Sequence, residues 1–387
     1  MSIYLDYNAT TPLDGWVLDA MMPFLREQFG NASSGHQSGR AARAAMDVAR
    51  EQVAALVNVH PSQVIFTSGG TEANNLALKG RAARLTPGYI VLSGVEHSSV
   101  RTPANVLQKY GWMLDEIGVD SNGQLVSENL RAIFSRMPTD SAKMLAVMLA
   151  NNETGVIYDT APIAALAREF GATLLVDAVQ AAGKMPVDFT DSGAQFMSLS
   201  AHKIYGPKGV GALIVDKAVD MEPMLHGGGH EKARRAGTEN VAAIVGFGKA
   251  AELALSELST RRAQSQKLRD HLETRLRSEL PQVCIFGQQA ARLPNTSFFA
   301  LPGLDGETLL MSLDQTGLAV SSGSACATGE VEPSHVLLSM GVSPERAREA
   351  IRISLGKESR RDEIDSFIDC LKQQVRVLQS FAAVACA

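Results

Sequence analysis

Residues 196–215 read FMSLSAHKIYGPKGVGALIV. Two apolar runs in this stretch, residues 196–199 and 210–215, have the length of buried strands. The polar, glycine-rich turn between them carries Lys203. We therefore expect a strand, a turn with a lysine near its start, and a second strand.

The same alternation of strand and helix signals extends over most of the chain. Strand signals lie at residues 64–67, 89–92, 144–149 and 173–176, and helix signals at residues 40–57, 73–80 and 162–170. Strands that alternate with helices imply right-handed crossovers and a largely parallel sheet. The expected fold class is therefore α/β.

The C-terminal third has a different pattern. Residues 241 to about 280 read as a long helical connector, and a smaller α+β unit follows it. The last helix of that unit has a capping-box-like start at residues 359–362 and an apolar stripe at helical spacing, which we interpret as packing. We expect a large domain at residues 15–257 and a small domain formed by residues 1–14 and 258–387.

The composition is that of an ordinary globular protein. Of the 387 residues, 45% are hydrophobic and 20% are charged, and the net charge is −5. Lysine and arginine are scattered, which argues against a nucleic-acid surface, and no apolar run approaches the length of a membrane span. The N-terminus lacks the basic and apolar regions of a signal peptide. We expect a cytoplasmic protein with no nucleic-acid or membrane partner.

The four cysteines, Cys284, Cys326, Cys370 and Cys386, lie far apart without metal-ligand spacing. We therefore expect free thiols in a reducing compartment and no metal site. Cys326 lies among small and polar residues, which predict an exposed loop. A thiol in such a loop can reach a substrate once it is deprotonated, and the alternative is an incidental surface cysteine. Cys284 is expected to be buried in a strand.

Three features at the predicted strand ends suit one cofactor, pyridoxal 5′-phosphate. Lys203 can hold the cofactor aldehyde as a Schiff base. Asp177, at the end of a predicted strand, can pair with the ring nitrogen, although a helix N-cap is the structural alternative. The loop at residues 69–71 opens a helix and can bind the phosphate, although a simple capped turn is equally compatible with it.

Three further polar residues have two interpretations each. His97 can stack on a planar ring and relay protons, or it can form a structural hydrogen bond. Asn152 can donate to a phenolic oxygen or a carboxylate, or it can occupy a turn. Arg352 lies inside an apolar strand, where its charge requires a partner, either a substrate carboxylate or an internal acidic residue.

These residues lie within segments that match a known pattern nearly end to end. The chain resembles the cysteine desulfurases, the NifS/IscS-like group of fold-type I enzymes in the class V aminotransferase family. The matching segments are residues 4–12, 67–72, 96–97, 151–155, 177–180, 200–209, 235–240, 322–326 and 352–356. The resemblance implies the fold of the pyridoxal-phosphate-dependent transferases, which is similar to that of aspartate aminotransferase.

The resemblance also implies how the cofactor is held. Lys203 binds it covalently, Asp177 pairs with the ring nitrogen and His97 stacks on the ring. The residues implied at its phenolic oxygen are Asn152 and Gln180, and those at its phosphate are Gly70, Thr71, Ser200 and His202. Thr238 joins the phosphate site from the second subunit of a homodimer.

The implied reaction removes sulfur from L-cysteine. Arg352, with Asn152, binds the substrate carboxylate, and Lys203 removes the α-proton. The Cys326 thiolate then attacks the substrate sulfur and becomes a persulfide, and L-alanine is released. The sulfur passes to an acceptor protein, such as an iron–sulfur scaffold or a sulfur carrier.

Alternative functions share most of these residues. A selenocysteine lyase would have the same fold and cofactor, and a class V aminotransferase would need no loop thiol. A non-enzymatic scaffold would have no reason to combine Lys203, Asp177 and Cys326. The segments at residues 30–34 and 226–233 depart from the common family pattern. The end of the chain does not resemble the extension with which housekeeping members bind an iron–sulfur scaffold, so the sequence leaves the acceptor open.

Overall fold

The computed structural model describes residues 3–322 and 332–385. Its largest sheet has seven strands in the order β2-β8-β7-β6-β5-β3-β4. These strands are β2 (Val64–Thr67), β3 (Tyr89–Ser93), β4 (Met113–Ile117), β5 (Lys143–Met148), β6 (Ala172–Asp177), β7 (Phe196–Ser200) and β8 (Gly211–Val215). β8 runs antiparallel to the other six strands of this sheet, so those six all end at the same edge. The predicted α/β fold with a largely parallel sheet is confirmed.

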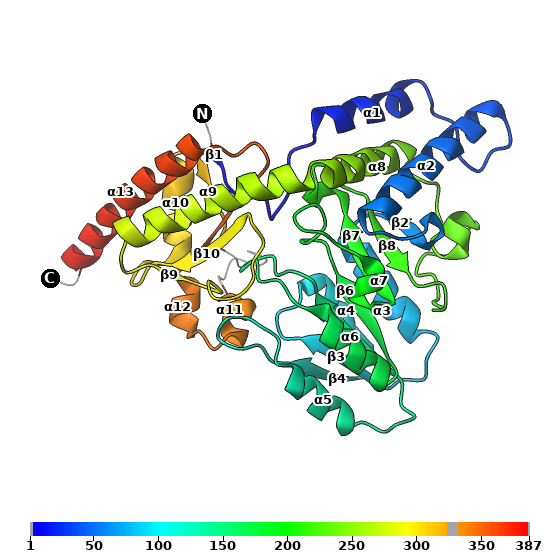
Figure 1. Ribbon diagram of the computed structural model, residues 1–387, viewed down its shortest axis with the longest axis horizontal. Coiled ribbons are helices and arrows are strands. Elements are labelled where there is room, and N and C mark those ends of the chain that lie inside the picture. Colours follow the sequence, from blue (N-terminus) through cyan, green and yellow to red (C-terminus); the bar gives the residue numbers. More distant parts are fainter. Residues whose placement is uncertain (1–2, 323–331, 386–387) are drawn as a thin grey trace.

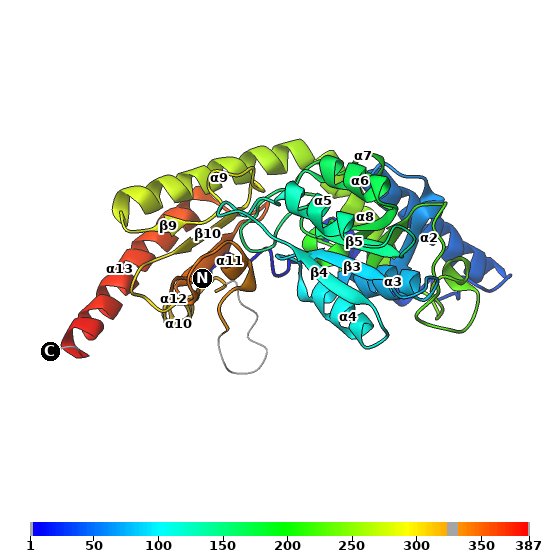
Figure 2. The ribbon, with the colours of Figure 1, turned by 90° about the horizontal axis from the view of Figure 1, so that it is seen from below.

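Helices cover both faces of this sheet. They are α1 (Gly15–Arg26), α2 (Gln37–Leu56), α3 (Gly70–Ala82), α4 (Ser98–Gln108), α5 (Ser127–Ser135), α6 (Thr160–Glu169), α7 (Phe189–Ser192) and α8 (Val241–Ser256). Figure 2 shows α3 and α4 on one side of the strands, and α6 and α7 on the other. Since both faces are covered, most of these strands are continuous apolar runs, which explains why they were recognisable in the sequence. The exception is the edge strand β4, which is largely exposed and was not predicted.

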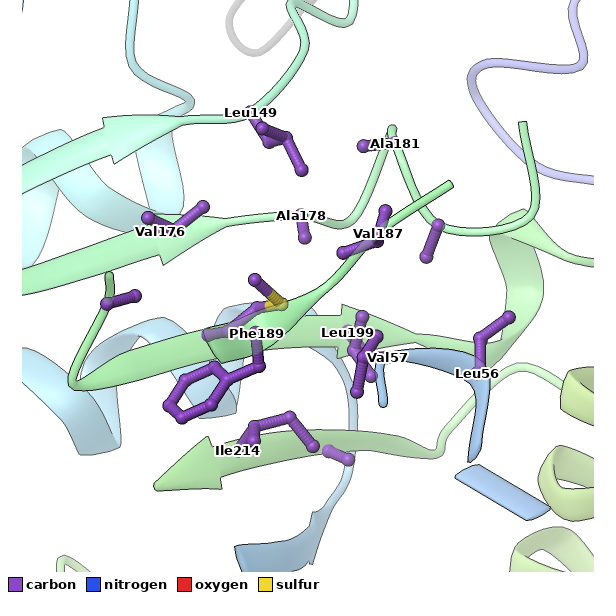
Figure 3. Packing of buried hydrophobic residues seen from close by; sticks show 14 of the residues in the cluster. Leu56, Val57, Leu149, Val176, Ala178, Ala181, Val187, Phe189, Leu199 and Ile214 are labelled. Atoms are coloured by element: carbon purple, nitrogen blue, oxygen red, sulfur yellow. The ribbon is translucent and has the colours of Figure 1, made fainter. Parts of the chain in front are cut away.

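Alternate residues of each strand enter two different cores. In β5, Met144 packs in the core on the α3 and α4 side, whereas Leu145 packs in the opposite core. Figure 3 shows part of the latter core, with Leu199 of the sheet near Val57 and Phe189. The sheet edge that carries the strand ends is therefore held rigidly from both sides.

A second, smaller part of the molecule has its own core. Its antiparallel sheet places β10 (Thr296–Ala300) between β9 (Cys284–Ile285) and β12 (Ala350–Ser354), and β1 (Ile3–Tyr4) pairs with β11 (Leu318–Ala319). Its helices are α9 (Leu258–Glu279), α10 (Gly306–Gln315), α11 (His335–Ser339), α12 (Pro344–Arg348) and α13 (Arg361–Ala385). Short 3₁₀ turns lie at Pro61–Gln63, Ala201–Lys203 and His230–Ala233.

The predicted helical connector consists of two helices, α8 and α9. They meet at Glu257, which ends the first helix and precedes the second. Figure 1 shows α9 extending from the large sheet toward the small one. Helices start at both predicted domain boundaries, at Gly15 and Leu258, while the division into two domains stays a prediction.

The N-terminal segment connects the two parts. Leu5 is buried in the small core, together with residues of α9, α10 and α13. A few residues later, Thr11 N–H and Oγ1 donate to the carbonyl oxygen of His202, at the edge of the large sheet. The segment therefore passes the edge at which the parallel strands end.

Two local predictions are wrong. Cys284 lies in a strand but is exposed, because β9 is a two-residue edge strand whose alternation directs Ile285, and not Cys284, into the core. The capping box predicted at residues 359–362 is shifted by one residue. Glu363 accepts a hydrogen bond from the Arg360 N–H, whereas the Ser359 hydroxyl accepts from Gly356 N–H.

Among the described helices, none combines the length and the apolar character that a membrane crossing requires.

Candidate active site

A cavity of about 660 Å³ lies at the edge where the parallel strands end. The ends of β5, β6 and β7 lead into it, together with the N-termini of α3 and α4. The predicted site residues that line it are Gly70, Thr71, His97, Asn152, Asp177, Gln180, Ser200, His202, Lys203 and Arg352. The structure therefore brings residues of the large sheet and a residue of β12 into one cavity.

Lys203 ends the 3₁₀ turn that follows β7. Its Nζ donates hydrogen bonds to the carbonyl oxygens of Asn8, at 2.5 Å, and Ala9, at 2.8 Å. Burial lowers the pKa of Lys203 to about 8, and the charge of Arg352 acts in the same direction, against Asp6 and Asp177. The side chain is therefore a better base than an ordinary lysine at neutral pH.

Asp177 ends β6 and is buried at the cavity. Its Oδ2 accepts a hydrogen bond from Asn74 Nδ2 at 2.8 Å, and its Oδ1 accepts one from Val179 N–H at 3.0 Å. The alternative from the sequence was a helix N-cap, but no helix begins in the described stretch between Asp177 and α7, so the contact with Val179 caps a turn instead. Asp177 also borders the cavity. Both of these partners donate to the Asp177 side chain.

The start of α3 forms a narrow cradle. Gly69, which precedes the helix, has φ of 155° and offers no side chain to its first N–H groups. A Cβ on Gly70 would lie 2.8 Å from Val179 Cγ2 and 3.6 Å from Ser200 Cβ. Backbone N–H groups and the positive end of the helix dipole thus face a space that glycine keeps open, as an anion site requires.

His97 precedes α4 and caps it. Its Nδ1 accepts a hydrogen bond from the Ser99 N–H at 3.1 Å, so in the neutral ring Nε2 carries the proton. Burial lowers the pKa of His97. The structural hydrogen bond that we considered from the sequence is therefore present, and the ring also lines the cavity.

His202 is also held in its neutral form. Its Nδ1 lies 3.1 Å from Thr10 Oγ1, and burial, together with the charge of Lys203, lowers the pKa of His202 to about 4. A neutral imidazole can offer an N–H group to an anion in the cradle.

Arg352 has an internal acidic partner. Its Nη2 lies 2.6 Å from Asp6 Oδ1, and its Nη1 donates to the carbonyl oxygen of Asn152 at 3.1 Å. Its Nε is buried without a partner within the described part of the chain. Of the two partners considered from the sequence, the internal acidic residue is therefore present, and it is Asp6.

Several buried polar residues of the site were not assigned a role from the sequence. Asn8 and Asn74 are both almost fully buried, and Glu153 lines the cavity and accepts a hydrogen bond from the Ser334 hydroxyl. Burial raises the pKa of Glu153 to about 7. Asn8 and Glu153 belong to segments of the family pattern, which was the one available signal, since nothing in their local sequence predicts burial.

Two predicted site residues are not found among the described residues that line the cavity. Thr238 is exposed and lies outside the lining. Cys326 lies outside the described residues. On either side of that gap, Ser321 and the stretch from Glu332 to His335 do line the cavity.

The cavity can be tested against pyridoxal phosphate by its chemistry. Lys203 supplies an amine, Asp177 a carboxyl group that accepts from Asn74, and Gly70 a cradle that a Cβ would fill. Asn74 Oδ1 is buried and lacks a partner among the described residues. These groups are the ones that an aldehyde, a pyridinium nitrogen and a phosphate need, so the residues fit this cofactor. No cluster of metal-ligating side chains occurs in residues 3–322 and 332–385.

Comparison with known proteins gives one consistent result. A profile of the family described as Aminotransferase class-V matches residues 3–367. A cysteine desulfurase IscS of Dictyoglomus turgidum is 40% identical over 382 residues, which are 98% of this chain and 96% of the relative. A cysteine desulfurase of Sinorhizobium fredii is 43% identical over 380 residues, or 97% of each chain.

The solved structures agree with the sequence relatives. One described as a NifS-like protein superposes with a TM-score of 0.90 at 35% identity, covering 97% of this chain and 100% of its own. The similarity therefore spans both sheets and all segments that line the cavity.

Proposed function

Since the chain belongs to the class-V aminotransferase family and is a cysteine desulfurase, we propose that L-cysteine loses its sulfur in the cavity of about 660 Å³. The main support for this proposal is that Lys203, Asp177 and Arg352 all line that cavity. An amine, a carboxylate and a guanidinium group can bind an aldehyde, keep a ring nitrogen protonated and hold a substrate carboxylate.

Enzymes of this family use pyridoxal phosphate, which supplies an electron sink for negative charge that develops at the substrate α-carbon. Lys203 would hold its aldehyde carbon, Asp177 its ring nitrogen and His97 one face of its ring. The residues that would bind its phosphate are Gly70, Thr71, Ser200 and His202, and those at its phenolic oxygen are Asn152 and Gln180. The proposal is supported by the lining of the cavity, which includes all of these residues.

Lys203 is suited to move the α-proton of the substrate. With a pKa of about 8, roughly a tenth of the Nζ groups are neutral at pH 7, compared with a few in ten thousand for an ordinary lysine. The neutral Nζ accepts the proton from the α-carbon and can return it to a neighbouring position.

Arg352 is suited to hold the substrate carboxylate. Arg352 lines the cavity, its guanidinium group is fixed at one side by Asp6, and the planar set of N–H donors of that group matches a carboxylate. A fixed guanidinium group orients the α-carbon toward Lys203 with little loss of side-chain entropy.

Cys326 is the proposed sulfur acceptor. Its thiolate forms a bond to the substrate sulfur while the bond between that sulfur and the β-carbon breaks. The electron pair of the broken bond stays on the carbon and takes up a proton, so L-alanine leaves and a persulfide remains on Cys326. Support comes from the cavity-lining residues Ser321 and Glu332, which flank the segment that contains Cys326.

The active form is proposed to be a homodimer. Several large apolar side chains on and after α1 are exposed in the single chain, with exposed fractions of 69% for Trp16, 58% for Leu25 and 88% for Phe29. Such apolar exposure is typical of a surface that another protein covers. Thr238 is exposed as well, as is needed for a residue that completes the phosphate site of a second subunit.

The sulfur acceptor is proposed to be another protein in the cytoplasm. Free thiols are typical of a reducing compartment, and the described cysteines Cys284 and Cys370 are free. An iron–sulfur scaffold and a sulfur carrier both offer the nucleophilic thiolate that would take sulfur from Cys326.

Mass spectrometry after exposure to L-cysteine tests this function. The protein loaded with pyridoxal phosphate should gain about 32 Da, one sulfur atom, on the peptide that contains Cys326, and it should release L-alanine. Cys326→Ser should abolish both the added mass and the alanine, while the bound cofactor keeps its absorbance.

The matched control is Cys284→Ser, which removes an exposed thiol outside the cavity lining and should leave alanine formation unchanged. Full activity of Cys326→Ser on L-cysteine would disprove the persulfide role. Transfer of the amino group to a keto acid, in place of alanine release, would assign the protein to the aminotransferases instead.

A further inference from the structure

One partly buried lysine beside the cavity has no role so far. Lys184 lies in the turn after β6, and the turn packs closely on the segment that carries Lys203. Gly183 has φ of 73°, and a Cβ at that position would lie 2.7 Å from Ile204 Cγ2. The position of Lys184 is therefore fixed relative to the residue that follows Lys203.

The Lys184 Nζ bonds to two amide side chains. It donates to Gln180 Oε1 at 2.5 Å and to Asn8 Oδ1 at 2.9 Å. A lysine ammonium group is a donor without an acceptor, so the end of each amide that faces it must be the oxygen. Lys184 thus favours one orientation of each amide, and for Asn8 it acts together with Asn295, whose Nδ2 donates to the same Oδ1 at 3.1 Å.

The opposite ends of these amides are consistent with that assignment. Gln180 Nε2 donates to the Asn8 carbonyl oxygen at 2.9 Å, and Asn8 Nδ2 donates to the Asn152 carbonyl oxygen at 3.0 Å. Carbonyl oxygens only accept, so the amide nitrogens must face them. The same Asn8 carbonyl oxygen accepts from Lys203 Nζ, which links Lys184 to Lys203 through two residues.

The environment of Lys184 is unfavourable for its charge. Its two described partners are neutral amides, unlike the nearby Lys357, which pairs with Asp14. Burial holds the pKa of Lys184 well below its usual range, and the charges of Lys203 and Arg352 add to the effect. A lysine that only tied down a turn would gain more from a surface position or from a carboxylate partner.

We propose that Lys184 is a positioning residue, which turns the Gln180 amide so that its nitrogen is on the side of the cavity. The Gln180 amide nitrogen has two hydrogens. One is donated to the Asn8 carbonyl oxygen, so the second can be donated to the phenolic oxygen of the cofactor. The inference rests on the proposed function, because it concerns the hydrogen bond from Gln180 to that cofactor.

A double-mutant cycle tests the inference by the affinity of the apoprotein for pyridoxal phosphate. Lys184→Met should raise the dissociation constant at least ten-fold and shift the absorbance maximum of the bound cofactor, because Gln180 Oε1 then loses its donor and the amide is no longer held with its nitrogen toward the phenolic group. In a Gln180→Leu background the same change should raise the constant less than two-fold, since the group that Lys184 orients is gone.

Lys143→Met is the matched control. Lys143 is buried and donates to three carbonyl oxygens, of Pro138, Thr139 and Ser141, but it begins β5 and therefore lies at the opposite edge of the sheet. Its variant should lose stability toward urea and keep the wild-type affinity and spectrum.

Three results would overturn the inference. If Lys184→Met loses stability but keeps the wild-type affinity and spectrum, as expected of Lys143→Met, then Lys184 does not position Gln180. Equal effects in both backgrounds would show that Lys184 does not act through Gln180. A wild-type protein that binds no pyridoxal phosphate would overturn the proposed function and this inference with it, whereas the first two results leave the proposed function intact.

Discussion

Two buried carboxyl groups near the cavity hold their protons more tightly than usual. Burial raises the pKa of Glu96 to about 8 and that of Glu153 to about 7. Glu153 accepts from the Ser334 hydroxyl, and Glu96 accepts from Met148 N–H at 2.7 Å. Both carboxyl groups are therefore protonated and neutral over part of the physiological pH range. Their ionisation destabilises the folded protein.

Glu153→Gln should change the pH dependence of stability. The folded protein keeps the Glu153 proton between pH 4.5 and about 7, whereas the unfolded chain has lost it, so the wild-type free energy of unfolding falls as the pH rises through this window. The loss approaches about 3 kcal/mol, and glutamine, which cannot ionise, avoids it. Urea unfolding of the apoprotein at pH 5 and pH 7.5 measures the difference.

Glu116→Gln, a change at a side chain with 43% exposure, serves as the control and should leave the wild-type pH profile unchanged. Parallel profiles for wild type and Glu153→Gln would refute the assignment of a protonated Glu153.

At the scale of elements, the start of α3 shows how a strand and a helix make an anion site. β2 ends at the same edge as β6 and β7, because β8 is antiparallel to both β2 and β7. The helix that follows β2 thus directs its N-terminus at the cavity, beside the ends of the two central strands.

Gly70→Ala should weaken the binding of pyridoxal phosphate about ten-fold or more. The added methyl group would lie 2.8 Å from Val179 Cγ2, so either the methyl group or the displaced valine enters the cradle. Titration of the apoprotein with the cofactor, followed by absorbance, gives the dissociation constant. Gly15→Ala makes the same change at the first residue of α1, where a Cβ meets nothing within 4 Å, and should leave the constant unchanged. If Gly70→Ala binds the cofactor with wild-type affinity, the N-terminus of α3 is not part of the phosphate site.

Strands of the large sheet that are buried on both faces were predictable, whereas the exposed edge strand β4 and the pairing of the two-residue strands were not. The predicted strand at residues 64–67 coincides with β2, and that at residues 196–199 differs from β7 by one residue. These strands are buried on both faces, so their composition alone identifies them. β9 and β11 have two residues each, and their pairing depends on distant partners, which explains why Cys284 was wrongly expected to be buried.

At the scale of the whole molecule, the N-terminal segment ties the two parts together at the cavity. Asn8 N–H donates to Ser354 Oγ in the small part, while the Asn8 carbonyl oxygen accepts from Gln180 and Lys203 in the large part. Asp6 binds Arg352 across the same junction. The two sheets are therefore held in a fixed relation where the substrate would bind.

Mixing two inactive variants tests the proposed homodimer. Lys203→Ala removes the reactive amine, and Thr238→Asp places a negative charge where the phosphate of the partner's cofactor would lie, so neither variant should be active alone. In a mixed dimer, Lys203 of one chain and Thr238 of the other complete one intact site. Random mixing in equal amounts should restore about a quarter of the wild-type alanine formation. No gain over the separate variants after subunit exchange would mean that each site is built from one chain.

The identities of the groups at the strand ends were determined by the sequence itself. Lys203, Asp177 and Gly70 each follow a strand that its apolar run reveals, and the parallel topology guarantees that such ends meet. Only the tertiary structure decided that Asp6 partners Arg352 and that Lys184 reaches Asn8. Those contacts join segments far apart in the chain, and periodicity in a sequence reports only neighbours within a helix or strand.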